Sequence, residues 1–223
     1  MAAEAFRFDG ALDPWKRGQI VPLCVGSVLD IGCNDGNLVA WLVQQGRQAE
    51  GIDIDAELIA RARRNHPGCR YHEGADLARF ADGQFDTVVA WNVLEHIEDH
   101  EAALRQMTRI AKRRVILSIP KEDDLSLPDS RVTYRPYVDL THFHYYRRQT
   151  VLEMVQRLNL PAPRIDDISR ARPLLAYTKL GVPRWLCSAL DHLFWALASR
   201  RDSFFSSLRV VIDMPARQAA ATA

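Results

Sequence analysis

The sequence has 223 residues, of which 48% are apolar and 26% are charged, and its formal net charge at pH 7 is +1. This length and composition predict one globular domain and exclude two large ones. The near-zero charge argues against non-specific nucleic-acid binding, and four cysteines without a Cys-x-x-Cys pair argue against a structural zinc site or a disulfide framework.

The two ends of the sequence show no membrane-targeting pattern. Charged residues such as Glu4 and Arg7 interrupt the first 30 positions, so no continuous apolar segment of a secretory signal forms there. The apolar run at 186–198 contains Asp191 and His192 and is too short to span a bilayer. We therefore expect a cytoplasmic protein, with a disordered tail at 216–223.

Short runs rich in Val, Ile and Leu alternate with amphipathic stretches, which predicts an α/β fold with helices on both faces of a mostly parallel sheet. In chain order we expect strand 27–31, helix 36–45, strand 49–54, helix 55–65, strand 69–72, strand 85–91, helix 98–111, strand 114–119, helix 147–158, strand 164–168 and strand 208–214. The last strand follows no ordinary crossover helix, so we expect it to run antiparallel. The result is a doubly wound, Rossmann-like sheet of seven strands in a single domain, 1–215.

Two segments interrupt this alternation. Residues 121–146 contain two prolines and many His and Tyr residues, and an irregular segment this long in a compact domain usually has a function, so we expect a lid. Residues 173–203 predict an apolar pair of helices inserted before the last strand. The aromatic stripe at 183–205 is typical of core or lid packing, with a homodimer surface or a peripheral membrane contact as alternatives.

A candidate ligand loop lies in VLDIGCNDGN, residues 28–37, where a buried strand leads into a glycine loop and a helix. Asp53 ends the second strand about 20 residues later, where a carboxylate can accept hydrogen bonds from both hydroxyls of a ribose. Asp30 and Asp35 would repel a pyrophosphate, so the loop favours a zwitterionic or cationic nucleoside. The alternative is an ordinary strand-to-helix turn with Asp53 as a helix cap.

Four ordered motifs resemble those of class I S-adenosylmethionine-dependent methyltransferases over residues 10–160. They are VLDIGCNDGN at 28–37, GIDID at 51–55, GQFDTVVAWNVLEHI at 83–97 and RVILSIP at 114–120. The resemblance implies S-adenosylmethionine as the cofactor and methyl transfer as the activity. It implies cofactor contacts for Asp30, Gly32, Cys33, Asn34, Gly36, Asp53, Ile54, Asp76, Asn92 and Val93.

Within that set the resemblance assigns different parts of the cofactor to different residues. Asp30 and Gly32 would meet the methionine part, and Asp53 would bind the ribose hydroxyls. The adenine would contact Ile54 and Asp76. Asn92 and Val93 fall where the family lines the methyl-transfer site.

Asn34 departs from the family pattern, because glycine is usual at this position of the loop. Asn is the residue other than glycine that best tolerates the left-handed backbone region. We therefore expect a positive φ at Asn34 and an intact loop.

The segment 137–150, YVDLTHFHYYRRQT, holds the first candidates for a general base, which a hydroxyl acceptor usually needs. It resembles an Asp-x-x-His element in the lid of sugar and quinone methyltransferases, which implies His142 as the base and Asp139 as its partner. An equal alternative is that both residues cap the following helix or hold the lid shut. His144 lies in the same segment.

His96 and Glu95 form the second candidate, with a role as anchors of the loop as the favoured alternative. Certain ubiquinone-pathway O-methyltransferases carry Glu-x-x-Glu-His at the corresponding place and bind a divalent metal. Here Asn92 takes the place of the first glutamate, so two ligands remain and we expect no metal.

The acceptor implied by the resemblance is a hydroxyl group of a sugar, a glycan or a lipid-linked small molecule. This rests on the composition of the helical insertion, which resembles that of bacterial methyltransferases of surface-glycan synthesis. N-methylation of a small molecule or a nucleic acid is the alternative chemistry. A non-catalytic protein that binds S-adenosylmethionine is the alternative class, and no nucleic-acid partner is expected.

Overall fold

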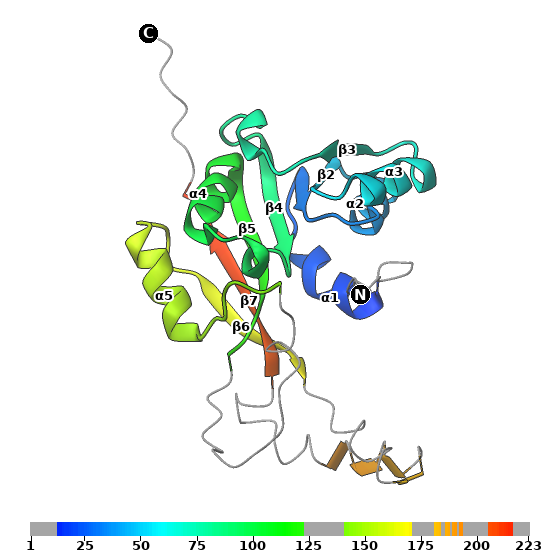
Figure 1. Ribbon diagram of the computed structural model, residues 1–223, viewed down its shortest axis with the longest axis vertical. Coiled ribbons are helices and arrows are strands. Elements are labelled where there is room, and N and C mark those ends of the chain that lie inside the picture. Colours follow the sequence, from blue (N-terminus) through cyan, green and yellow to red (C-terminus); the bar gives the residue numbers. More distant parts are fainter. Residues whose placement is uncertain are drawn as a thin grey trace.

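The computed structural model describes residues 13–122, 141–170, 181–183, 186–187, 189–190, 192–193 and 205–215. They form one seven-stranded sheet with helices on both faces (Figure 1). The strands are β1 (Val28–Ile31), β2 (Ala49–Asp53), β3 (Arg70–Glu73), β4 (Phe85–Trp91), β5 (Ala111–Pro120), β6 (Arg164–Arg170) and β7 (Phe205–Asp213). The helices are α1 (Pro14–Ile20), α2 (Asn37–Gln44), α3 (Ala56–Asn65), α4 (His100–Ile110) and α5 (Arg148–Arg157), with short 3-10 helices η1 (Val21–Leu23), η2 (Leu77–Arg79) and η3 (Leu94–His96).

The strand order is β3-β2-β1-β4-β5-β7-β6. β1 pairs in parallel with β2 and β4, while β7 runs antiparallel to both of its neighbours, β5 and β6. The α/β class, the seven strands and the antiparallel last strand predicted from the sequence are confirmed. Because β1 and β4 lie side by side at the centre, their carboxyl ends place the loop after β1 beside the loop after β4.

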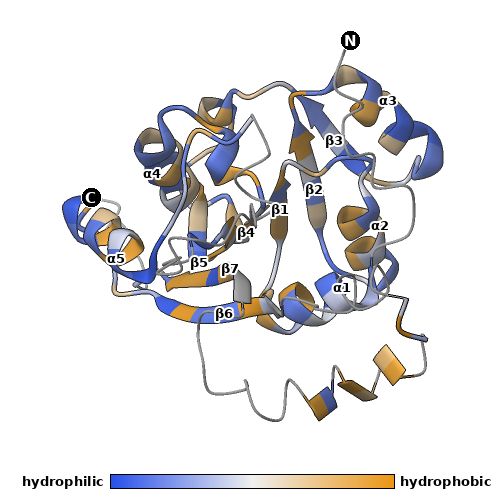
Figure 2. Cartoon of the chain, turned by 60° about the horizontal axis from the view of Figure 1, so that its bottom comes forward, coloured by the Kyte–Doolittle hydropathy of each residue, from blue (hydrophilic) through white to orange (hydrophobic). Residues whose placement is uncertain are grey.

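Both faces of the sheet are covered because successive residues of a strand point to opposite sides. Val88 packs in the cluster that contains Leu104 of α4 and Val151 of α5. The next residue, Val89, packs in the cluster that contains Ile20 of α1 and residues of α2 and α3. Figure 2 shows hydrophobic colour on the central strands and hydrophilic colour on the outer sides of α3 and α5. This two-sided burial explains why the central strands read as nearly continuous apolar runs.

The helix ends follow the signals in the sequence. Asp55 caps α3 by accepting hydrogen bonds from the backbone N–H groups of Glu57 and Leu58, at 2.8 and 3.1 Å. The helix ends at Asn65, two residues before Pro67. Helix α1 was not among the predicted elements, although Asp13 caps it and Pro14 occupies its first position.

Several predicted segments lie wholly or largely outside the described residues. They are the tail at 216–223, residues 123–140 of the expected lid at 121–146, and most of the expected helical insertion at 173–203. Within that insertion the described residues 186–187, 189–190 and 192–193 are helical. No helix in the described part of the chain is long and apolar enough to cross a bilayer.

Candidate functional site

The loop between β1 and α2 has three left-handed backbone positions. Gly32 has φ 69°, Asn34 has φ 50° and Gly36, the N-cap of α2, has φ 80°. The positive φ predicted for Asn34 is confirmed. The Asn34 side chain donates to the Gly32 carbonyl oxygen at 3.2 Å, so the amide stabilises the turn that a glycine would form without it.

Asp53 joins this loop to the end of β2. One of its carboxylate oxygens accepts from the backbone N–H of Asn34 at 2.8 Å, and the other accepts from the N–H of Asp55 at 3.0 Å. A carboxylate oxygen can accept more than one hydrogen bond, so Asp53 keeps the capacity to bind the hydroxyls of a ribose. The next side chain, Ile54, is 76% exposed and offers an apolar surface beside that carboxylate.

The glycines of the loop allow close approach of neighbouring side chains. A Cβ atom on Gly32 would lie 2.4 Å from the Val93 Cγ2 atom, so the loops after β1 and β4 touch here. A Cβ atom on Gly36 would lie 2.4 Å from the hydroxyl oxygen of Tyr71, which donates to the Gly36 carbonyl at 3.1 Å. Only glycine fits at these two positions without displacement of a neighbour.

The side chain of Cys33 is turned away from the loop surface. It is buried in the core on the α1–α3 side, against the position that a Cβ atom of Gly51 would occupy, 2.7 Å from its sulfur. Burial raises the pKa of the Cys33 thiol well above its usual range. A cofactor in the loop could therefore contact only the backbone of Cys33, so the contact that the resemblance implies for this residue would be a backbone contact.

Asp30 is a buried carboxyl group directly before the loop, with 4% of its surface exposed. Burial raises its pKa to about 7; the Lys16 ammonium opposes this shift and the Asp53 carboxylate adds to it. Near neutral pH the group is therefore poised between its two forms. A ligand ammonium placed beside it would favour the ionised form.

Two further cofactor candidates lie on exposed turns. Asp76 is the N-cap of η2 and accepts from the N–H of Ala78 at 2.9 Å. Asn92, the residue after β4, has φ 56° and donates its N–H to the Ser118 carbonyl at 2.9 Å. The second contact holds the loop after β4 against the end of β5, next to the Gly32 and Val93 contact.

A cluster of one carboxyl group and two imidazoles follows that loop. Candidate ligand atoms of Glu95, His96 and His142 all lie within 4.8 Å of one another, and the two histidine rings meet edge to face with centroids 4.7 Å apart. Glu95 is 1% exposed. Phe143 donates its N–H to the Glu95 carbonyl oxygen at 2.8 Å. The structure thus brings together two of the three predicted catalytic residues, His96 and His142, while Asp139 lies outside the described residues.

Thr141 fixes the orientation of the His96 ring. The Nδ1 atom of His96 lies 3.0 Å from the Thr141 hydroxyl oxygen and 3.2 Å from the Thr141 carbonyl oxygen. In the tautomer that donates from Nδ1 to the carbonyl, Nε2 keeps its lone pair and can accept a proton.

His144 belongs to a separate group of contacts. Its Nε2 atom lies 2.9 Å from the Glu98 carbonyl oxygen, and its ring stacks on His100 with centroids 3.7 Å apart. The Nδ1 atom of His100 lies 3.0 Å from the hydroxyl of the buried Tyr146. Burial, with the neighbouring His144, lowers the pKa of His100. These contacts hold the described end of the lid against α4 and separate His144 from the Glu95 cluster.

A family model described as a methyltransferase domain matches residues 17–161, more than half of the chain. The chain belongs to this family. The chain is 36% identical over 103 residues to an uncharacterized methyltransferase of Mycobacterium tuberculosis, covering 45% of this chain and 50% of that protein. It is 34% identical over 111 residues to a ubiquinone biosynthesis O-methyltransferase of Xanthomonas oryzae, covering 46% of each. The chain thus spans about half the length of the curated relatives it matches.

Solved structures share the fold of the chain. A SAM-dependent methyltransferase from Archaeoglobus fulgidus superposes with a TM-score of 0.63 at 19% identity, covering 89% of this chain and 91% of that one. A Haemonchus contortus phosphoethanolamine N-methyltransferase in complex with S-adenosyl-L-methionine gives a TM-score of 0.60 at 17% identity, covering 86% and 49%. The resemblance read from the four motifs is confirmed at the level of family and fold.

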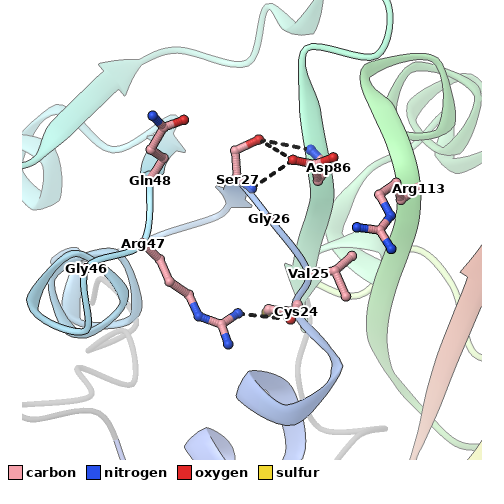
Figure 3. A pocket seen from close by; sticks show the side chains of 9 residues that line it. All are labelled: Cys24, Val25, Gly26, Ser27, Gly46, Arg47, Gln48, Asp86 and Arg113. Atoms are coloured by element: carbon pink, nitrogen blue, oxygen red, sulfur yellow. Dashed lines mark hydrogen bonds between the residues drawn. The ribbon is translucent and has the colours of Figure 1, made fainter.

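A hollow of about 610 Å³ lies at the other end of the sheet, at the amino ends of β1, β2 and β4 (Figure 3). Inside it the Ser27 N–H and hydroxyl both donate to Asp86, at 3.0 and 3.1 Å. Arg47 donates to the Cys24 carbonyl oxygen at 2.9 Å. These contacts tie the strand ends together, far from the loops after β1 and β4, and we assign them a structural role.

The argument against a metal site made from the sequence counted too few candidate ligands. It counted two donors, Glu95 and His96, whereas the fold adds His142 from a segment about 45 positions away. A carboxylate with two imidazoles is a donor set that suits a transition-metal ion. The expectation that the chain holds no metal stays a prediction.

Proposed function

We propose that this methyltransferase transfers the methyl group of S-adenosylmethionine to an acceptor hydroxyl group, with His142 or His96 receiving the hydroxyl proton. The observation that carries the proposal is the cluster of Glu95, His96 and His142 beside the loop after β4. Two imidazoles next to a buried carboxylate supply proton acceptors, which an amine acceptor in its neutral form would not need.

Residues at the carboxyl ends of β1 and β2 offer groups that suit the cofactor part by part. Asp53 and the exposed Ile54 offer a carboxylate for ribose hydroxyls and an apolar surface for adenine. Asp30 offers a carboxyl group whose ionised form an amino group would stabilise. When bound, S-adenosylmethionine supplies an activated methyl group on a sulfonium, so much of the catalysis consists of alignment.

The chain's own contribution is to move one proton. With the cofactor bound, the acceptor oxygen would give its proton to the lone pair of an imidazole nitrogen and form a bond to the methyl carbon, while the carbon–sulfur bond would break and leave its electron pair on sulfur. The Glu95 carboxylate, close to both rings, stabilises the imidazolium that results. The imidazolium then returns the proton to solvent. General-base assistance of this kind contributes about 10²- to 10⁴-fold in rate.

A hydroxyl acceptor agrees with the name of one relative, the ubiquinone biosynthesis O-methyltransferase. A sugar, glycan or lipid-linked acceptor is the finer part of the proposal and rests on the composition of residues 173–203 alone. The acceptor panel must therefore contain both phenolic and sugar hydroxyls.

The test has two stages. Calorimetric titration with S-adenosylmethionine measures cofactor binding, and release of S-adenosylhomocysteine is then measured with catechols, sugars and amines as acceptors. We expect His142→Ala and His96→Ala to lower the rate on the hydroxyl acceptor by about 10²-fold or more, and His66→Ala, at the C-cap of α3, to leave it unchanged. No cofactor binding, or methylation of amines only, would refute the proposal.

A further inference from the structure

The chain returns to the end of β5 at Tyr146, which is joined there to the two residues that follow the strand. Lys121 forms a parallel bridge with Tyr146, and the Glu122 N–H donates to the Tyr146 carbonyl oxygen at 2.7 Å. The Arg147 guanidinium pairs with the Glu122 carboxylate at 2.9 Å. Backbone and side-chain contacts therefore connect the end of β5 to the residues just before α5.

One carboxylate, that of Asp167 on the edge strand β6, binds a cation on each side of this junction (Figure 1). The Lys121 ammonium lies 2.6 Å from one oxygen of Asp167, and the Arg148 guanidinium donates to the other oxygen at 2.6 Å. Arg148 is the first residue of α5 and also donates to the Ile165 carbonyl oxygen at 2.7 Å. Asp167 thus ties both the end of β5 and the start of α5 to β6.

Burial distinguishes Asp167 from its neighbour on the same strand. The side chains of Lys121 and Asp167 are 12% and 11% exposed, and removing one partner of such a buried pair leaves an uncompensated charge. Asp166 points to the opposite face of β6, is 52% exposed and pairs with Arg209 at 2.7 Å. A surface pair of that kind contributes little. Asp167 is therefore the carboxylate of this pair of residues that can fix the course of the chain.

The course of the chain at this junction decides where one imidazole of the cluster lies. His96 belongs to η3, directly after β4, so the sheet itself sets its place. His142 lies four positions before Tyr146, and its ring meets the His96 ring with centroids 4.7 Å apart. We propose that Asp167 is a positioning residue, which fixes the returning segment through its two cations and so sets His142 against His96. The kinetic part of this inference rests on the proposed function, because it takes the same imidazoles as proton acceptors, whereas the ring contact does not.

The experiment compares the unaltered protein with Asp167→Asn and with the matched control Asp166→Asn. Nuclear Overhauser effects between the His96 and His142 rings, in protein labelled at its seven histidines, report the ring contact. Calorimetry gives the dissociation constant of S-adenosylmethionine, and release of S-adenosylhomocysteine gives kcat with whichever catechol or sugar is methylated.

We expect Asp167→Asn to remove the effects between the two rings and to lower kcat about tenfold or more, since a small displacement of a catalytic group is costly. The dissociation constant of S-adenosylmethionine should stay within about twofold, because the cofactor loop lies on β1 and β2. Asp166→Asn should change none of the three quantities. Asp167→Glu, which keeps the carboxylate, should restore part of the ring contact and of kcat.

The outcomes separate this inference from the proposed function. If Asp167→Asn keeps the ring contact and kcat, the inference alone fails. It also fails if the variant weakens S-adenosylmethionine as much as it lowers kcat, because Asp167 then supports the whole fold. If the unaltered protein methylates no hydroxyl acceptor, the proposed function and the kinetic part fail, and the ring contact in the variants still decides the positioning role.

A second variant covers the case in which Asp167→Asn does not fold, as judged by thermal unfolding. Arg148→Met removes the more exposed of the two cations and leaves the buried pair in place. It should weaken the effects between the two rings and lower kcat in the same direction. An unchanged ring contact and kcat in this variant would overturn the inference.

Discussion

Acidification should weaken the binding of S-adenosylmethionine through one buried carboxyl group, Asp30. Burial raises the pKa of Asp30 to about 7, so the free protein takes up a proton there as the pH falls below neutrality. The cofactor brings an amino group and a sulfonium to this loop, and both favour the ionised carboxylate. Binding at low pH must therefore expel the proton.

The size of the effect follows from that pKa. If only the ionised form binds, the apparent dissociation constant is multiplied by one plus the ratio of protonated to ionised Asp30. With a pKa of about 7 the factor is about 1.1 at about pH 8 and about 11 at about pH 6. The affinity should fall about tenfold over this range, or about 1.4 kcal/mol.

Calorimetry in two buffers of different ionisation enthalpy measures both the affinity and the protons released. We expect close to one proton released per cofactor at about pH 6 and close to none from Asp30 at about pH 8. Asp30→Asn keeps the shape of the side chain and retains only the titration of the cofactor's own amino group. The difference between the two proteins isolates Asp30, and identical pH profiles would refute the reasoning.

Four further predictions concern the same loops. Without cofactor, the unaltered protein should lose about 2–3 kcal/mol of unfolding free energy between about pH 5 and about pH 8, and Asp30→Asn should not show this loss. The reason is that a raised pKa of Asp30 stabilises the fold at low pH, and that stabilisation is lost as the pH rises through about 7. Asn34→Gly should bind S-adenosylmethionine about as well as Asn34, since φ is already 50°; a loss above about fivefold by calorimetry would contradict this. Gly32→Ala should destabilise the protein by more than Gly46→Ala in urea unfolding, because both have a positive φ but only the Gly32 methyl group meets a side chain, Val93 at 2.4 Å. A chelator should leave methyl transfer unchanged; loss of activity that Mn²⁺ or Zn²⁺ restores would make Glu95, His96 and His142 a metal site.

The elements that could be predicted are those with strong local signals. The predicted strand 85–91 coincides with β4, because a short run with buried apolar side chains on both faces, from Phe85 and Val88 to Ala90, is typical of a buried strand. The helix at 55–65 was marked by an aspartate cap and a following proline. In the structure Asp55 caps α3, and the helix ends before Pro67. Helix α1 was missed because seven residues are too few for a helical period to show, although Asp13 followed by Pro14 was a usable start signal.

The contact of Asp53 with the loop after β1 was also predictable, because its spacing is set by local structure. β1 and β2 pair in parallel, with Ile31 opposite Ile52. This pairing places the turn after β1 beside the acidic residue at the end of β2. Asp53 and Asn34 consequently meet, as the 2.8 Å hydrogen bond between them records. The direction of the Cys33 side chain, which enters the core, could not be predicted, because consecutive loop residues point in different directions.

The contact of His96 with His142 could not be predicted, because no local signal fixes where a long irregular segment returns. In the structure that return is set by backbone pairing at the end of β5. Lys121 forms a bridge with Tyr146, and the Glu122 N–H donates to the Tyr146 carbonyl oxygen at 2.7 Å.

That pairing places the described end of the lid along η3 and α4. From there Tyr146 reaches His100, and four positions earlier along the chain His142 meets His96. The imidazole cluster therefore depends on the pairing of residues 121–122 with Tyr146 as much as on the histidines themselves. A change that breaks this pairing should separate the two rings while leaving the cofactor loop, on β1 and β2, intact.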